Sequence, residues 1–269
     1  MGNKRLFALY ECDGCNSDFS VFEDELAKSA AIFLFSAQVK GKKGVPTLRS
    51  QQKLSRAEVN EHGFSFQEHE GDAILSTDET TRTVRLKLKH QRYRPLGVYK
   101  ALTKVALTLM PEHELNAFQE AMKWIKAPIA RGAIMKPSIC LRTLIPGPRP
   151  IPAPHVILFR RKPGKDVPYS MLFLATGNTS FQVNVPCLAH DVERHTYRFP
   201  PVPMTTSIDL DLAQGPPLHY QEDLSSPDLI DAPSEMTFHY DENEVRTQTG
   251  SARPSAFRSL EIRPITESI

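Results

Sequence analysis

The sequence contains no long apolar run and little cysteine, and each shortage excludes a class of protein. No stretch approaches the roughly 18 apolar residues of a membrane span, and the start, MGNKRLFALYE, lacks the apolar core of a signal peptide. Four cysteines in 269 residues are too few for a disulfide framework. The sequence therefore predicts a reduced, cytoplasmic protein with no membrane partner. Its 40% of apolar residues is typical of a soluble protein with a core.

Charge is spread unevenly, although the net charge is only +2. Residues 200–269 hold 12 acidic and 4 basic residues, so the first 199 residues carry a net charge of +10. An acidic tail on a basic body suggests that the body meets an anion and that the tail shields it. A solvated body with a loosely constrained tail explains the same charges equally well.

Hydrophobic periodicity predicts an α+β fold. Apolar residues at helical spacing predict a helix over 17–35, with a capping box at Ser20 and Glu23, and two further helices over 98–109 and 111–125. Alternating or short apolar runs predict strands. The predicted strands are 63–69, 72–77, 81–94, 155–161, 169–176 and 180–188, the last three forming a small antiparallel sheet.

Proline marks the remaining segments. The stretch 145–155, IPGPRPIPAPH, is expected to be extended, as a linker or an edge segment. Residues 200–269 are Pro-rich, acidic and weakly periodic, so we expect a tail that is largely irregular.

Two basic segments are suited to bind nucleic-acid phosphates, because Lys and Arg release the counterions of a phosphate backbone. One is the loop 40–56, which has six basic residues and no acidic one; the other is the strand around residue 86, whose outward positions are basic. A solvated edge strand carries Lys for a different reason, to discourage aggregation. The residues predicted to contact nucleic acid, DNA or RNA, are Lys40, Lys42, Lys43, Arg49, Arg85, Lys87 and Lys89.

Cys12 and Cys15 form a C-x-x-C pair, while Cys140 and Cys187 stand alone and are expected to be small buried residues. A C-x-x-C pair supplies half of a tetrahedral zinc site. It also occurs as a redox dithiol, but that motif belongs in a βαβ pattern, which is missing here. The neighbouring Glu11 and Asp13 would raise rather than lower a thiol pKa. Half of a zinc site is therefore the preferred interpretation.

The whole segment GNKRLFALYECDGCNSDFSVFEDELAKS resembles the HNH endonuclease superfamily, in its branch closed by a zinc-binding cysteine pair. Gly2–Asn3 matches the turn with the middle Asn, ECDGCN matches the second cysteine pair with the third motif residue, and the helix follows. VKGKKGVPTLRS also looks like the sequence that commonly comes next. The resemblance covers residues 2–50 and is faint beyond them.

The resemblance implies a ββα zinc motif that hydrolyses nucleic-acid phosphodiester bonds. Cys12 and Cys15 would be ligands of a structural Zn²⁺. Asn16 would contact a catalytic divalent metal such as Mg²⁺, and Asn3 would brace the turn. The motif's general-base His and first cysteine pair have no counterpart before Gly2. His62, His69, His190 and His195 offer no ready substitute.

Three explanations fit these gaps: the true start lies upstream, the gene has decayed, or the module has kept binding and lost catalysis. We expect the first, with impaired activity in this chain. The alternative is a non-catalytic module that binds nucleic acid or a protein, with a vestigial zinc motif. The expected division is a partial HNH-like motif and basic loop over 1–57, an α+β domain of unknown role over 58–199, and the acidic tail over 200–269.

Overall fold

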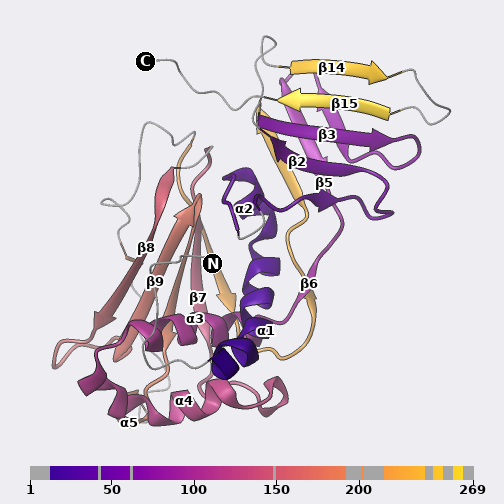
Figure 1. The fold of residues 1–269 in the computed structure, drawn as a ribbon. Coiled ribbons are helices and arrows are strands. Elements are labelled where there is room, and N and C mark those ends of the chain that lie inside the picture. The colour runs from indigo at the N-terminus through magenta and orange to yellow at the C-terminus, as the bar shows by residue number, and fades with distance from the viewer. Residues whose placement is uncertain are drawn as a thin grey trace. The chain divides into compact units, whose positions relative to one another are not determined.

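A computed structural model describes residues 13–41, 44–60, 63–147, 150–191, 201–202, 215–239, 245–250 and 257–262 (Figure 1). The chain divides into two compact units, and each is assembled from two separate stretches of sequence. Unit 1 takes Met1–Ser29 and Arg92–Ile230, and unit 2 takes Ala30–Gln91 and Asp231–Ile269. The units thus combine distant stretches, whereas the expected division followed the chain in consecutive ranges.

Unit 1 is a five-stranded antiparallel sheet with helices packed against it. The strand order is β11-β7-β10-β9-β8, and α3 lies against β9 and β10 with α1 beside it (Figure 1). β6 and β12 form a separate two-stranded sheet. The elements are α1 (Asp13–Ser29), β6 (Arg92–Tyr93), α3 (Pro95–Leu109), η1 (Glu112–Phe118), α4 (Gln119–Lys126), η2 (Ile129–Arg131), β7 (Ile139–Leu144), β8 (Ile151–Arg160), β9 (Ser170–Gly177), β10 (Thr179–Val185), α5 (Leu188–Asp191), β11 (Leu218–Asp223) and β12 (Ile230–Asp231).

The predicted antiparallel sheet over 155–188 is confirmed as β8, β9 and β10. Every residue of β9 and β10 is buried; α3 packs against these central strands, and Val202 packs against the apolar cluster that includes Phe173 and Ala175 of β9. The Pro-rich stretch forms the start of β8, which is an edge strand as expected. Pro152 and Pro154 have no N–H to offer a further strand, and the β8–β9 register shifts between Ile151 and His155.

Unit 2 is built from two antiparallel sheets and a short helix. A five-stranded sheet has the order β1-β2-β3-β15-β14, and a three-stranded sheet has the order β13-β5-β4. The elements are α2 (Ala31–Ser36), β1 (Leu48–Arg49), β2 (Arg56–Asn60), β3 (Gly63–His69), β4 (Leu75–Asp78), β5 (Thr83–Lys87), β13 (Glu235–His239), β14 (Val245–Gly250) and β15 (Phe257–Ile262).

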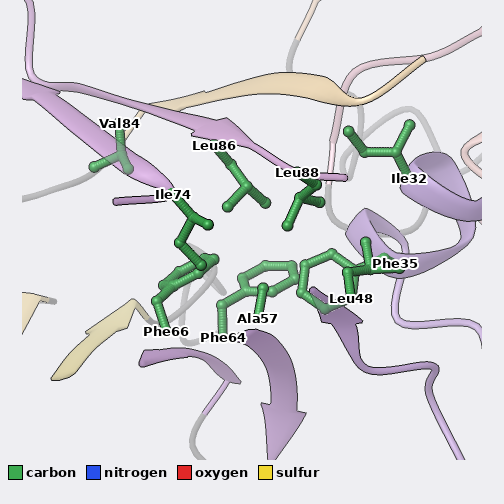
Figure 2. Close-up of a cluster of buried hydrophobic side chains, with 10 residues drawn as sticks. All are labelled: Ile32, Phe35, Leu48, Ala57, Phe64, Phe66, Ile74, Val84, Leu86 and Leu88. Atoms are coloured by element: carbon green, nitrogen blue, oxygen red, sulfur yellow. The ribbon is translucent and has the colours of Figure 1, made fainter. Parts of the chain in front are cut away.

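Ten buried apolar side chains fill the space between these elements of unit 2 (Figure 2). The predicted alternation around β5 is confirmed: Val84, Leu86 and Leu88 point into this core, and the basic residues between them are exposed. The ten residues are Ile32, Phe35, Leu48, Ala57, Phe64, Phe66, Ile74, Val84, Leu86 and Leu88.

The prediction of an irregular tail is wrong for most of the described residues after 215. They form β11, which pairs with β7 in unit 1, and β13, β14 and β15 in unit 2. β15 lies in the middle of its sheet, between β3 and β14. These strands are five or six residues long, so an alternation such as that of Met236 and Phe238 in β13 covers too few residues to stand out in the sequence. They are strands because they pair with strands that are distant in the sequence.

Two helix boundaries also differ from the prediction. A single helix over 17–35 was expected, whereas α1 ends at Ser29 and α2 begins at Ala31. The predicted cap at Ser20 is wrong, because Ser20 lies inside α1 and its hydroxyl donates to the carbonyl of Ser17 at 2.6 Å. After α3, Pro111 precedes the 3₁₀ helix η1, and α4 begins only at Gln119.

Candidate functional site

The C-x-x-C pair lies at the amino end of α1. The helix begins at Asp13, between the two cysteines, so Cys15 and Asn16 fall in its first turns. Cys12 and Asn3 lie outside the described residues. The helix expected after the pair is therefore confirmed as α1, and the zinc and metal roles of Cys12, Cys15, Asn3 and Asn16 stay predictions.

A buried carboxylate joins α1 to α3. Glu25 is only 3% exposed, and its two oxygens accept from Arg94, one from the backbone N–H at 2.7 Å and one from the guanidinium at 3.1 Å. Gly97 makes this approach possible, since a Cβ there would lie 2.8 Å from Cγ of Glu25. Two helical turns further along α3, Lys104 pairs with Glu23 at 3.1 Å. Two acidic residues of α1 are thus held by basic residues of α3 and the residue that precedes it.

Lys100 of α3 is fully buried and joins three helices. Its ammonium donates to the carbonyl of Trp124 at 3.0 Å and to that of Ala127, at the carboxyl end of α4. It also lies 5.1 Å from the ring centroid of Phe22 on α1 and 5.2 Å from that of Trp124. Burial, assisted by the charge of Arg131, lowers the pKa of Lys100 to about 8. With carbonyls and rings as its partners and no exposed surface, this amine is suited to hold helices together.

Arg142 of β7 binds the carboxyl end of α1. Its guanidinium lies near the carbonyl and the hydroxyl of Ser29, at 3.4 and 3.3 Å. It also pairs with Glu222 of β11 at 3.3 Å and stacks 4.7 Å from the ring centroid of Phe181. A cation is favourable at a helix carboxyl end, where the last carbonyls carry partial negative charge. The helix that begins at the cysteine pair is therefore anchored along its length to the sheet and to α3.

Cys140 and Cys187 are buried, as expected, and are poor candidates to complete a zinc site. Burial raises the pKa of Cys140 to about 12 and that of Cys187 to about 11. The thiol of Cys187 donates to the carbonyl of Ala117 at 3.3 Å. Within the described ranges, no group of three or more His, Cys, Asp or Glu side chains lies close enough together to hold a metal ion.

The predicted nucleic-acid contacts are spread over unit 2. Lys40 and Arg49 are exposed, and Lys42 and Lys43 lie outside the described residues. Arg49 lies opposite Arg56 in the β1–β2 pair, which brings two guanidinium side chains to neighbouring positions. Whether these residues contact nucleic acid stays a prediction.

The basic side chains around β5 are exposed on a face of mixed charge. Lys87 lies opposite Glu235 of β13, and their charged groups are 3.6 Å apart. Arg85 lies between Ser76 and Thr237 of the neighbouring strands. Glu235 belongs to the segment expected to be an irregular acidic tail that shields the body. One acidic residue of that segment therefore forms an exposed ion pair with a predicted phosphate contact from within the sheet.

The β8–β9 hairpin of unit 1 carries a cluster of basic residues that the sequence prediction missed. Arg160, Arg161, Lys162 and Lys165 lie within six residues of one another around a Pro-Gly turn. The signal was present in the sequence, as RRKPGK. It was missed because this stretch was assigned to the end of a strand, and only the fold shows which aromatic rings accompany it.

Comparison with known proteins gives no relative: no family model, no curated protein and no solved structure matches this chain. Among the described helices, none is both long and apolar enough to cross a membrane. The residues themselves are therefore the basis for a functional proposal.

Proposed function

We propose that this chain is part of an HNH-type endonuclease, an enzyme that hydrolyses nucleic-acid phosphodiester bonds with a divalent metal. The observation that carries the proposal is that Cys15 and Asn16 lie in the first described turns of α1, directly after Cys12 in the sequence. In the motif that the sequence resembles, this stretch opens a helix and supplies zinc and metal ligands. The buried partners of Glu25, Lys100 and Arg142 support the proposal, because a ligand set needs a rigid element to hold it.

In this proposal, Cys12 and Cys15 bind a structural Zn²⁺ and Asn16 contacts a catalytic metal such as Mg²⁺. Asn3 braces the turn before the helix. The metal would stabilise the leaving oxygen of the phosphodiester. The motif also needs a His that activates water, and the sequence has no His before Gly2. We therefore expect this chain to bind zinc and nucleic acid, and to cleave little or not at all by itself.

Cobalt binding tests the zinc site, because Co²⁺ replaces Zn²⁺ and its charge-transfer absorption reports cysteine thiolates. We expect a band that disappears in Cys12→Ser and Cys15→Ser. Cys140→Ala and Cys187→Ala are matched controls, since both thiols are buried, and should keep the band. A chain that shows no thiolate band under any of these conditions contradicts the zinc assignment.

Plasmid nicking tests the enzyme class. The assay uses this chain and a version extended by whatever residues its gene encodes in frame ahead of Met1, each with Mg²⁺, Mn²⁺ or no metal. Metal-dependent nicking that is lost in Asn16→Ala supports the proposal. If an extended protein that binds zinc leaves plasmid uncut with every metal, the nuclease assignment is wrong.

The second candidate is a non-catalytic module that binds nucleic acid or a protein partner. One observation favours it: the basic hairpin of unit 1 is well formed without any part of the C-x-x-C motif. Nucleic-acid binding by an extended chain that shows no thiolate band with Co²⁺ and cleaves with no metal would decide for this candidate. Deleting residues 205–269 cannot test shielding by the tail, because it would remove β11, β13, β14 and β15 from their sheets.

A further inference from the structure

The tip of the β8–β9 hairpin places two lysines side by side. Lys162, Pro163, Gly164 and Lys165 form a tight turn, closed by the N–H of Lys165 donating to the carbonyl of Lys162 at 3.3 Å. Gly164 has φ +77°, the value that the third residue of a type II turn requires, and proline suits the second position. The first and last residues of such a turn lie close together, so two like charges are held near each other in solvent.

Arg161 secures this tip to the rest of unit 1. Its guanidinium pairs with Asp191 at 3.0 Å and donates to the carbonyls of Val167 and His190, each at 3.0 Å. Asp191 also accepts the backbone N–H of Tyr169 at 3.1 Å. Arg161 is therefore already paired within unit 1, and its contacts hold the hairpin in place without a bound ligand.

Aromatic rings lie directly beside these charges. The ring of Tyr169 stacks on that of His190, with centroids 4.0 Å apart and an interplanar angle of 24°. The guanidinium of Arg160 lies 5.2 Å from the Tyr169 centroid, and the Arg160 side chain is 58% exposed although it also pairs with Glu114. Tyr169 is buried, whereas His190 is exposed. The stack thus ends in a ring that solvent can reach.

Exposed cations next to an exposed stacking ring match the chemistry of a single nucleic-acid strand, whose phosphates need charge and whose unpaired bases need an aromatic partner. The bases of a duplex are stacked on one another and are not available to His190, and an acidic peptide would use the cations without the ring. We propose that the β8–β9 hairpin is a binding site for single-stranded nucleic acid, with Lys162, Lys165 and Arg160 at the phosphates and one base stacked on His190.

An aromatic ring beside the cations distinguishes the hairpin from β5. Arg160 and Arg161 both lie over the ring of Tyr169, whereas among the described residues no such ring contact involves Arg85 or Lys87. The hairpin site shares only its nucleic-acid partner with the proposed nuclease. It uses no residue of the C-x-x-C motif, so the two proposals fail separately.

Fluorescence anisotropy with a labelled oligothymidylate, at several salt concentrations, tests the proposal on the full chain. Lys162→Gln with Lys165→Gln should weaken binding roughly tenfold and reduce the slope of log K against log salt by about 1.4, from two phosphates at about 0.7 each. His190→Ala should weaken binding by about fivefold or more without changing that slope. His190→Phe keeps a ring and should restore most of the affinity.

Lys123→Gln with Lys126→Gln is the matched control, because it removes the same charge from exposed positions of α4 that belong to no proposed site, and it should leave the affinity unchanged. Equal binding by the wild type and the Lys162/Lys165 variant overturns the proposal. So does tighter binding of duplex than of single strand, or a control variant that loses as much affinity as the hairpin variant. Cys12→Ser should leave oligonucleotide binding intact. This variant therefore tests the hairpin site independently of whether Cys12 and Cys15 bind zinc.

Discussion

The two units differ in what their buried charged groups connect. In unit 2, ten apolar side chains pack between two sheets, and the buried acidic residues accept from nearby backbone and hydroxyl groups. Unit 1 also buries many apolar side chains, and there buried charged groups in addition join the helices to one another and to the sheet. Glu25, Lys100 and Arg142 are all under 4% exposed. The stability of unit 2 should therefore depend mainly on packed volume, and that of unit 1 on packed volume and also on charge and pH.

Asp72 illustrates the arrangement in unit 2. Burial acts to raise the pKa of this carboxyl, but hydrogen bonds from Ser50, Ser55 and Leu54 outweigh it and hold the pKa below its ordinary value. All these partners come from the loop 50–55, so the acid closes a local turn. Lys100 in unit 1 has the opposite character, because its contacts link helices that are separate in the sequence.

The largest effect is expected from Phe66→Ala in unit 2. Phe66 is fully buried between the sheets, and its removal should cost about 3–5 kcal/mol of unfolding free energy through lost burial and a cavity. The chain's single tryptophan, Trp124, lies in unit 1, so its fluorescence follows unit 1 alone. In urea, the far-ultraviolet circular dichroism transition should move to lower urea more than the Trp124 transition does. Equal shifts of both signals would contradict the separation of the two interiors.

Glu25→Ala in unit 1 should come next, at about 2–3 kcal/mol, because it leaves the N–H of Arg94 without its buried acceptor. The estimate is reduced because the Arg94 side chain is 39% exposed. Here the Trp124 transition should shift. Asp24→Ala is the matched control on the same helix: it breaks an exposed pair with Lys28 and should cost under about 0.5 kcal/mol. If the two variants are equally stable, buried charge does not hold α1.

The smallest effect, taken over one pH unit, is a pH dependence of the unfolding free energy that comes from Lys100. Its folded pKa is about 8 and the unfolded pKa about 10.5, so between these values the unfolded state binds more protons. The contribution of Lys100 to the unfolding free energy should therefore rise with pH across this window, with a slope of at most about 1.4 kcal/mol per pH unit, and should be constant below pH 8. Cys140 and Cys187, whose pKa values burial raises from 9.0, act in the opposite direction above about pH 9. The difference in slope between the wild type and Lys100→Met, followed by the Trp124 signal, isolates the lysine. A slope unchanged in Lys100→Met would show that another group causes it.

The local patterns of the sequence predicted several elements correctly, for reasons that are local. The alternation Val84, Leu86, Leu88 requires a strand with one buried face, and the apolar stripe of 98–109 requires a helix. The C-x-x-C pair indicated the helix that begins at Asp13. Cys140 and Cys187, isolated in apolar surroundings, were correctly expected to be buried.

The prediction failed wherever a residue's role depends on a distant partner. β11 has the sequence LHYQED, in which only Leu218 and Tyr220 alternate with polar residues, and it is a strand because β7 pairs with it. Lys100 lies on a helix whose sequence gives no sign that a lysine there would be buried. His190 and Arg160 are thirty residues apart, and only the β8–β9 hairpin and α5 bring both against Tyr169.

The sequence by itself determined the α+β class, the alternating faces of its clearest strands and the cysteine pair at a helix start, because each follows from spacing along a few residues. The tertiary structure alone decided that the segment after 215 joins two different units, and that Glu235 pairs with Lys87. It also decided that a basic turn lies next to an exposed ring. These features depend on contacts between residues far apart in the chain, which no local pattern encodes.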